Sequence, residues 1–175
     1  MKQVYLLTGR PGTGKTSIIK QAVAGAKGRA GGFYTEEIRK QKVREGFSLV
    51  TLDGRSVLLA HVDIHSPYRV GKYGVDVDKL DEVGVSALHE AEHHCEFIVV
   101  DEIGNMELFS AGFREAVFRI IDSGKKLLGT IMLSPNPWAD EIKLKPRVNL
   151  VEVTRHNRLQ VLEELLCWLD FVKPS

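Results

Sequence analysis

The sequence predicts an α/β fold with a mostly parallel central sheet and an antiparallel meander added to it. Three patterns in its 175 residues support this prediction. An apolar run, Val4–Leu7, leads through a glycine-rich turn into a helical pattern. A second apolar run, Phe97–Val100, lacks polar alternation, which is typical of a strand buried on both faces of a parallel sheet. Between them, strand-like segments flank Asp53-Gly54, a strong hairpin signal.

Composition and charge narrow the class of protein. The chain is 43% hydrophobic and 27% charged, with a formal net charge of +1, so we expect one globular domain over residues 1–175. Near-neutral charge argues against a nucleic-acid partner, and no apolar run is long enough to span a membrane. Cys95 and Cys167 are far apart and are interpreted as free thiols in a reducing cytoplasm. The expected protein is therefore cytoplasmic, without a membrane partner, and monomeric.

The glycine-rich turn has the spacing G-x-x-x-x-G-K-[ST] of a phosphate-binding loop. Its glycines allow the backbone N–H groups to point inward, and the following helix, Ser17–Ala24, adds its positive dipole end. A lysine in the motif can reach terminal phosphates, and its hydroxyl residue can ligate Mg²⁺. The alternative is a glycine-rich turn with a stray lysine, but the complete motif follows a strand and opens a helix. We therefore predict nucleoside-triphosphate binding by Gly9, Arg10, Pro11, Gly12, Thr13, Gly14, Lys15 and Thr16.

The next segments predict an antiparallel meander of three strands: Phe33–Arg39, Gly46–Leu52 and Ser56–Val62. In the first of them, charged residues stand where apolar ones would alternate. Glu36 and Arg39 either face a cleft or belong to a solvated edge strand, and both interpretations remain open.

Residues 66–74 are predicted to form a loop that exposes Arg69 and Lys72. These two cations either cover bound phosphates as a mobile flap or are ordinary surface charges. Asp78 then has the character of an N-cap for an amphipathic helix. That helix runs into His93-His94-Cys95, which we interpret as a helix terminus and not as a metal site, because consecutive residues cannot converge on one ion.

A second chemical site is predicted where the strand Phe97–Val100 ends in Asp101-Glu102. An acid at the end of a buried strand beside a phosphate loop holds Mg²⁺, so Asp101 is assigned to the metal together with Thr16. Glu102 lies one position further along and is assigned as the general base that directs water at the terminal phosphate. The alternative is that Glu102 only caps or pairs with a loop cation.

The remaining segments complete the α/β pattern. Ser110 is expected to cap a helix that stops at Gly124, and strands follow at Leu127–Leu133 and Asn149–Val153. Ser134 either hydrogen-bonds the terminal phosphate or only ends its strand. The last helix starts near Asn157. Arg158 at its start is a candidate catalytic residue that neutralises phosphate charge or stacks on the base.

With both sites in view, the chain resembles the THEP1 family of nucleoside-triphosphatases. The most specific matches are Gly32–Glu37 and the Asp101–Gly104 part of Val100–Phe109. Arg69–Tyr73, Leu128–Ile131 and Val153–Arg158 also match. The resemblance implies a P-loop nucleoside-triphosphatase fold, RecA-like, with three layers. It also implies Mg²⁺-dependent hydrolysis of ATP, GTP, CTP and other triphosphates to diphosphates with low base selectivity. Besides the loop, it assigns nucleotide contacts to Phe97, Ile98, Val99, Val100, Asp101, Glu102, Ile103 and Gly104.

The sequence thus predicts a hydrolase in which Lys15, Glu102 and Arg158 are catalytic. Two other functions use the same loop. A nucleotide or small-molecule kinase would need an acceptor pocket and a lid, for which Arg69 and Lys72 are candidates. A slow, nucleotide-gated binding module would act on a partner protein or RNA.

Overall fold

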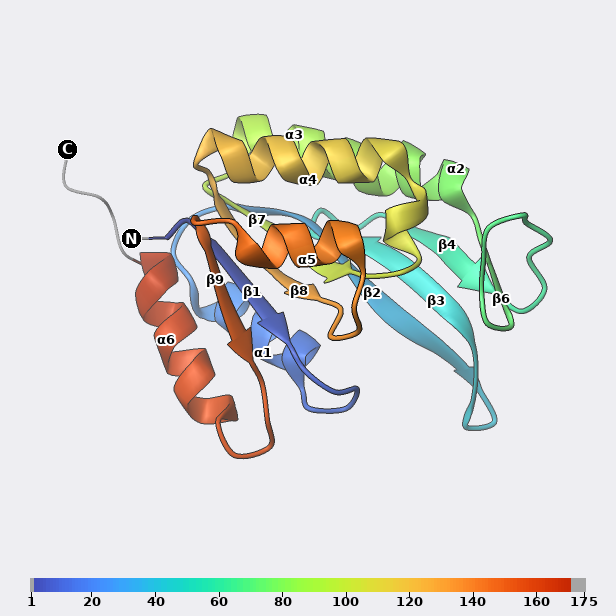
Figure 1. The fold of residues 1–175 in the computed structure, drawn as a ribbon, viewed down its shortest axis with the longest axis horizontal. Helices are drawn as coiled ribbons and strands as arrows, with labels where there is room; N and C mark the ends of the chain where they lie inside the picture. Colours follow the sequence, from blue (N-terminus) through green and yellow to red (C-terminus); the bar gives the residue numbers. More distant parts are fainter. Residues whose placement is uncertain (1, 171–175) are drawn as a thin grey trace.

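Within residues 2–170, which the computed structural model describes, all nine strands belong to one mixed sheet (Figure 1). Their order across the sheet is β5-β6-β4-β3-β2-β7-β8-β1-β9. The five strands from β2 to β9 in this order are parallel, and β3, β4, β6 and β5 continue the sheet in antiparallel pairing. The predicted fold class, with its antiparallel addition, is confirmed. The strands are β1 Val4–Thr8, β2 Ala30–Lys40, β3 Val43–Thr51, β4 Ser56–His61, β5 Arg69–Val70, β6 Tyr73–Val75, β7 Phe97–Ile103, β8 Lys126–Ile131 and β9 Val148–Glu152.

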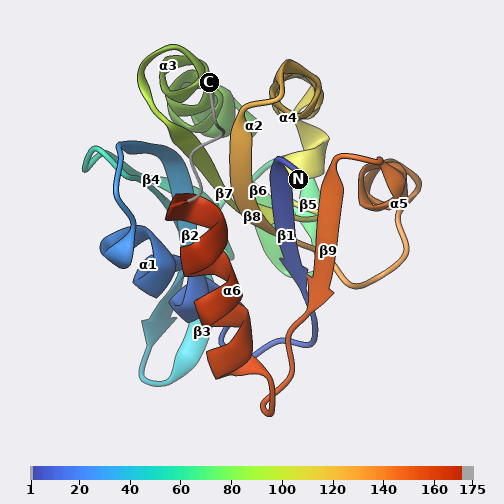
Figure 2. The same cartoon turned by 90° about the vertical axis from the view of Figure 1, so that its left-hand side faces the viewer.

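Helices cover both faces of this sheet and produce three layers (Figures 1 and 2). One face packs against α1 (Lys15–Gly25) and α6 (Arg158–Asp170). The other face packs against a second group of helices and turns. This second group comprises α2 Val77–Lys79, a π-helical turn Leu80–Val85, α3 Ser86–His94, a 3₁₀ turn Glu107–Phe109, α4 Ala111–Ser123 and α5 Pro137–Leu144.

None of the helices in the described part of the chain combines the length and apolar character needed to cross a membrane.

The first strand shows why its sequence is continuously apolar. Side chains alternate between the two faces of a strand. Accordingly, Val4 and Leu6 join the core beneath α3, α4 and α5, whereas Tyr5 and Leu7 join the core beneath α1 and α6. All four are at most 3% exposed, and each buried side chain contributes roughly 1.5–3 kcal/mol. This packing fixes β1, and with it the loop that follows.

Two predictions about local structure were wrong, and one helix was missed. Residues 66–74 do not form an irregular loop, because β5 and β6 pair within them and β6 also pairs with β4. The helix after them is capped by Asp76, whose carboxylate accepts a hydrogen bond from the Lys79 N–H at 3.0 Å, and Asp78 lies in its first turn. The helix α5 was missed, although Asn136 followed by Pro137 is a strong helix start.

The helix α4 follows its prediction at both ends. The Ser110 hydroxyl accepts a hydrogen bond from the Phe113 N–H at 2.9 Å, and Gly124 adopts the left-handed conformation after the last turn. The strand before it, β7, carries the predicted acidic residues at its carboxyl end. Because parallel strands β1 and β7 end at the same edge of the sheet, the loop and these acids face a common region.

Candidate functional site

The phosphate loop connects β1 to α1 and contains three glycines with positive φ. These angles are +142° at Gly9, +78° at Gly12 and +89° at Gly14, values that residues with a Cβ rarely adopt. Gly14 also caps α1, and no side chain of residues 2–170 makes a capping hydrogen bond at this helix end. The first N–H groups of the helix are therefore left for an anion, as the sequence motif predicts.

The Lys15 side chain lies along the inside of this loop. Its ammonium donates hydrogen bonds to the carbonyl oxygens of Gly9 and Arg10, each at 2.9 Å. Burial lowers the pKa of Lys15, and the carboxylates of Glu102 and Asp101 act against that shift. The loop lysine and the acidic pair are thus close enough to influence one another electrostatically.

Asp101 is almost fully buried at the end of β7, with 2% of its surface exposed. Thr130 on the neighbouring strand β8 donates a hydrogen bond to its Oδ1 at 2.6 Å. Its Oδ2 is buried and has no hydrogen-bond partner among residues 2–170. Burial raises the pKa of Asp101, while Thr130, Thr16 and two lysines oppose the shift.

This unpaired oxygen fits a divalent metal ion. A buried carboxylate oxygen without a donor is costly unless a cation occupies its lone pairs. The Thr16 hydroxyl is close enough to Asp101 to influence its pKa, and both are hard oxygen ligands of the kind that Mg²⁺ prefers. The donor set therefore agrees with the metal site predicted at Thr16 and Asp101.

Glu102 follows Asp101 through a cis peptide bond. Burial and the neighbouring Asp101 carboxylate raise the pKa of Glu102, and Lys15 opposes the shift. The carboxylate of Glu102 lies against the backbone of Gly104: a Cβ placed there would be 2.6 Å from Glu102 Oε1. Glu102 thus has the raised pKa and the proximity to Lys15 that suit a base acting beside a bound phosphate.

Arg158 comes to the same site from the far end of the sequence. A Cβ placed on Gly14 would lie 2.7–2.8 Å from three atoms of its guanidinium group, so the group packs flat on the phosphate loop. The turn before α6 is held by Asn157, whose side chain accepts from the Thr154 N–H and donates to the Glu152 carbonyl, both at 2.8 Å. The structure therefore brings together Lys15, Thr16, Asp101, Glu102 and Arg158.

Comparison with known proteins identifies the family. A family model described as NTPase matches residues 4–166. Nucleoside-triphosphatase THEP1 of Thermotoga maritima is 47% identical over 166 residues, which cover 95% of this chain and 95% of that protein. This chain belongs to the THEP1 family. The crystal structure of THEP1 from Aquifex aeolicus covers 96% of the chain at 35% identity, with a TM-score of 0.85 and 99% of that structure matched. The solution structure of a human cancer-related nucleoside triphosphatase also covers 96%, at 35% identity, with a TM-score of 0.78 and 97% of that structure matched.

In this THEP1-family chain the wall beside the acidic pair comes from β2. Tyr34 pairs with Asp101 across the β2–β7 ladder, and burial together with that carboxylate raises the pKa of Tyr34 to about 12. Lys20 lies over the Tyr34 ring and pairs with Glu36 at 2.8 Å. β2 pairs with β7 only over Ala30–Tyr34, so the stretch from residue 35 to Lys40 pairs with β3 alone. Glu36 and Arg39 are exposed there, which agrees with the solvated-edge interpretation. Glu36 lies on the side of α1, and Arg39 pairs with Glu37 at 2.7 Å.

Other candidate residues have partners away from the phosphate loop. The guanidinium of Arg69 donates to the carbonyls of Ile64 and Lys72, at 3.3 and 2.9 Å, and the Lys72 ammonium lies over the Tyr73 ring. These cations stabilise their own hairpin. Ser134 is exposed beyond the end of β8. Sequence reasoning missed Thr130, although a polar residue inside a buried strand is itself a signal of a functional hydrogen bond.

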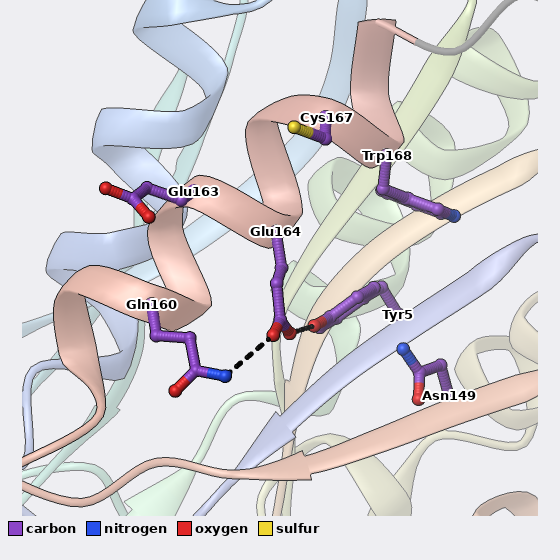
Figure 3. A pocket seen from close by; sticks show the side chains of 7 residues that line it. All are labelled: Tyr5, Asn149, Gln160, Glu163, Glu164, Cys167 and Trp168. Carbon is purple, nitrogen blue, oxygen red and sulfur yellow. Dashed lines mark hydrogen bonds between the residues drawn. The ribbon is translucent and has the colours of Figure 1, made fainter.

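A separate hollow of about 630 Å³ lies where α6 meets β1 and β9 (Figure 3). Its polar groups are largely satisfied by one another, since the Tyr5 hydroxyl donates to Glu164 at 3.0 Å and Gln160 donates to the same carboxylate at 3.1 Å. The hollow includes none of the predicted nucleotide-binding or catalytic residues, and we assign it no role in THEP1-family chemistry. Its lining is Tyr5, Asn149, Gln160, Glu163, Glu164, Cys167 and Trp168.

Proposed function

We propose that this chain is a Mg²⁺-dependent nucleoside-triphosphatase that converts ATP, GTP, CTP and other triphosphates to diphosphates and inorganic phosphate with low base selectivity. Family membership supports triphosphate hydrolysis as the reaction class. The observation that carries the proposal is the meeting of an anion-binding loop with two adjacent acids, the buried Asp101, which has an unpaired oxygen, and the partly buried Glu102. Such a site combines phosphate binding, metal binding and water activation.

Substrate binding begins at the loop. The backbone N–H groups of residues 9–16, except that of Pro11, which has none, surround the β- and γ-phosphates, and the positive end of α1 stabilises their charge. The Lys15 ammonium already lies among these groups, held by the carbonyls of Gly9 and Arg10. A phosphate oxygen is a stronger acceptor than a carbonyl, so the ammonium exchanges these partners for the terminal phosphates when substrate binds.

Thr16 and the free Oδ2 of Asp101 would hold the metal ion. When bound, Mg²⁺ supplies charge neutralisation on the phosphate oxygens. The hydrogen bond from Thr130 to Oδ1 of Asp101 keeps the second oxygen turned toward this position. The protein groups are thus arranged before any nucleotide enters, which lowers the cost of reorganisation during the reaction.

Hydrolysis then requires an activated water. The Glu102 carboxylate takes one proton from the water, and the water oxygen forms a bond to the γ-phosphorus. The bond between that phosphorus and the β–γ bridging oxygen breaks, and the nucleoside diphosphate leaves with the bonding electrons. Arg158, packed on Gly14, and Lys15 neutralise the charge that develops on the transferred group.

Low base selectivity follows from the same geometry. Each group assembled at the site addresses phosphate, metal or water, and these features are common to all nucleoside triphosphates. We therefore expect kcat/KM values within about tenfold of one another for the common triphosphates, a spread of about 1.4 kcal/mol.

Steady-state release of phosphate from ATP, GTP, CTP and UTP, each with Mg²⁺ and with EDTA, tests the proposal. We expect turnover of all four with the metal and loss of turnover with the chelator. Full activity in EDTA, or one triphosphate preferred more than a hundredfold, would contradict it. Diphosphate and phosphate are measured together, because diphosphate formed in excess of phosphate would show transfer to an acceptor and thus a kinase.

A further inference from the structure

The turn after the acidic pair contains a further acid, Glu107, which is buried and which the mechanism above does not use. Glu107 is 3% exposed and opens the 3₁₀ turn Glu107–Phe109. Burying a carboxyl group is unfavourable unless specific hydrogen bonds compensate. We therefore expect the buried Glu107 carboxyl group to make specific hydrogen bonds with its neighbours.

The Glu107 side chain reaches back to Gly104. Its Oε2 accepts a hydrogen bond from the Gly104 N–H at 3.2 Å, and both groups are buried. The carbonyl of the same glycine accepts from the Leu108 N–H at 3.1 Å. Both polar backbone groups of Gly104 are thus engaged by this turn, and the glycine has a defined place relative to β7.

Gly104 in turn supports the Glu102 carboxylate. A Cβ at Gly104 would be 2.6 Å from Oε1, 3.0 Å from Cδ and 3.1 Å from Cγ of Glu102. The end of the Glu102 side chain therefore lies directly on the bare α-carbon of this glycine. Any side chain there, or any shift of its backbone, would move the carboxylate that is proposed to activate water.

We propose that Glu107 is a positioning residue that holds Gly104 by its N–H group and thereby fixes the Glu102 carboxylate for attack on the γ-phosphate. This inference rests on the proposed function, because it assumes that Glu102 acts on the water. It assigns a role to the segment Asp101–Glu107 as one unit: an acid that binds metal, an acid that activates water, a glycine that supports it and an acid that holds the glycine.

The carboxyl group of Glu107 lies where a negative charge is unfavourable, which agrees with a specific structural role for this acid. Burial and the nearby Glu102 carboxylate raise the pKa of Glu107 well above its usual range, while the hydrogen bond from Gly104 acts in the opposite direction. A third acid beside two others opposes charge at the site, so a neutral residue would be more stable here if filling space were sufficient. The acid instead lies where its Oε2 accepts from the N–H of Gly104, the residue that contacts the Glu102 side chain.

Four variants separate positioning from general stability. Glu107→Gln keeps an acceptor oxygen for Gly104, Glu107→Leu removes it, and Gly104→Ala pushes directly on Glu102. Ser110→Ala is the matched control, because it removes the cap of α4 at the end of the same turn and leaves the Glu107–Gly104 contact in place. Each variant is characterised by its melting temperature, its Kd for a non-hydrolysable triphosphate, and its kcat and KM.

We expect kcat to fall about 10²-fold in Glu107→Leu and Gly104→Ala, because a small displacement of a catalytic group has effects of this size. KM and the Kd of the inert analogue should stay within about threefold, and Glu107→Gln should keep kcat within about threefold of the parent. Ser110→Ala should lower the melting temperature with little change in kcat. If Glu107→Leu does not fold, Glu107→Asp gives the same test, since it withdraws the carboxylate by one methylene and should lower kcat.

The inference is overturned if a folded Glu107→Leu variant keeps the parental kcat, or if Ser110→Ala loses as much kcat at an equal drop in melting temperature. The Glu102→Gln variant is measured in parallel, so that failure of this inference can be told apart from failure of the proposed function. Parental turnover in Glu102→Gln would refute the assignment of Glu102 as the base, whatever the Glu107 variants show. Crystal structures of Glu107→Leu and Gly104→Ala then report positioning without reference to rate. An unmoved Glu102 carboxylate in both would refute the positioning role.

Discussion

Exchanging Glu102 for glutamine removes the ability to accept a proton while preserving the size and shape of the side chain. General-base catalysis typically contributes 10²–10⁴-fold to rate, and we expect kcat to fall by this factor. At about 1.36 kcal/mol for each tenfold change, the barrier rises by about 2.7–5.4 kcal/mol. The side chain still fits over Gly104, because the amide occupies the same volume as the carboxylate, so no cavity or clash contributes to the loss.

The same change should stabilise the fold. Burial and the Asp101 carboxylate raise the pKa of Glu102, so its ionised form is disfavoured in the folded state. The stability that the protonated form contributes at low pH is lost as pH rises through the raised pKa, and glutamine escapes this loss. At pH 8 the variant should therefore melt at a higher temperature, by about 2–4 °C for each kcal/mol gained. Binding of an inert triphosphate should stay equal or tighten, since one negative charge near the phosphates is removed.

Single-turnover phosphate release, calorimetric titration with a non-hydrolysable analogue and thermal melting at pH 8 measure the three effects. Glu115→Gln, an exposed acid on α4, is the matched control and should change none of them. A Glu102→Gln variant that hydrolyses at the parental rate would refute the assignment of the base. A variant that loses rate only in proportion to lost nucleotide affinity would show a binding role instead.

Three further predictions follow from named contacts. Lys15→Ala should raise the Kd of an inert triphosphate, measured by calorimetric titration, by tenfold or more, which is about 1.4 kcal/mol. It should also lower kcat in a phosphate-release assay. Unchanged affinity would contradict the proposed contact between Lys15 and phosphate. Arg158→Ala should lower kcat by about 10³-fold, because the guanidinium packed on Gly14 is proposed to reach the transferred phosphate. Arg158→Lys should recover part of that loss. Equal kcat values in the parent and the alanine variant would exclude Arg158 from the mechanism. Because the pKa of Glu107 is raised, the parent should lose stability relative to Glu107→Gln as pH rises from 5 to 8, as measured by urea unfolding; parallel pH profiles would show that Glu107 does not titrate abnormally.

Local chemistry made much of the site predictable. The phosphate loop needs glycines at fixed spacing and a lysine that begins a helix, and all of these lie within residues 9–16. Ser110 and Gly124 were predicted correctly as helix ends because a cap depends on residues within one turn. The fold class and the family were also confirmed, since the buried strands and the specific segments are written continuously in the chain. The individual catalytic and metal-binding roles, by contrast, stay predictions.

Most of the errors and omissions involve contacts that a short segment does not show, whereas the start of α5 at Asn136-Pro137 was a local signal that was missed. Asp76 and Asp78 are equally good caps in sequence, and the chain path from β6 decides between them. β5 and β6 pair with each other as a hairpin, and the pairing of β6 with the more distant β4 joins this hairpin to the sheet. Thr130 was overlooked because its partner, Asp101, lies 29 positions away on a neighbouring strand.

The sequence by itself determined which chemical groups the protein carries: an anion-binding turn, two acids after a buried strand and an arginine before the last helix. Only the tertiary structure decided that these groups converge. The strand order places β8 between β1 and β7, so its Thr130 can turn the Asp101 carboxylate. Packing of α6 beside α1 brings Arg158 onto Gly14. Such relations depend on the burial of both faces of one sheet, which is a property of the whole chain and not of any short segment.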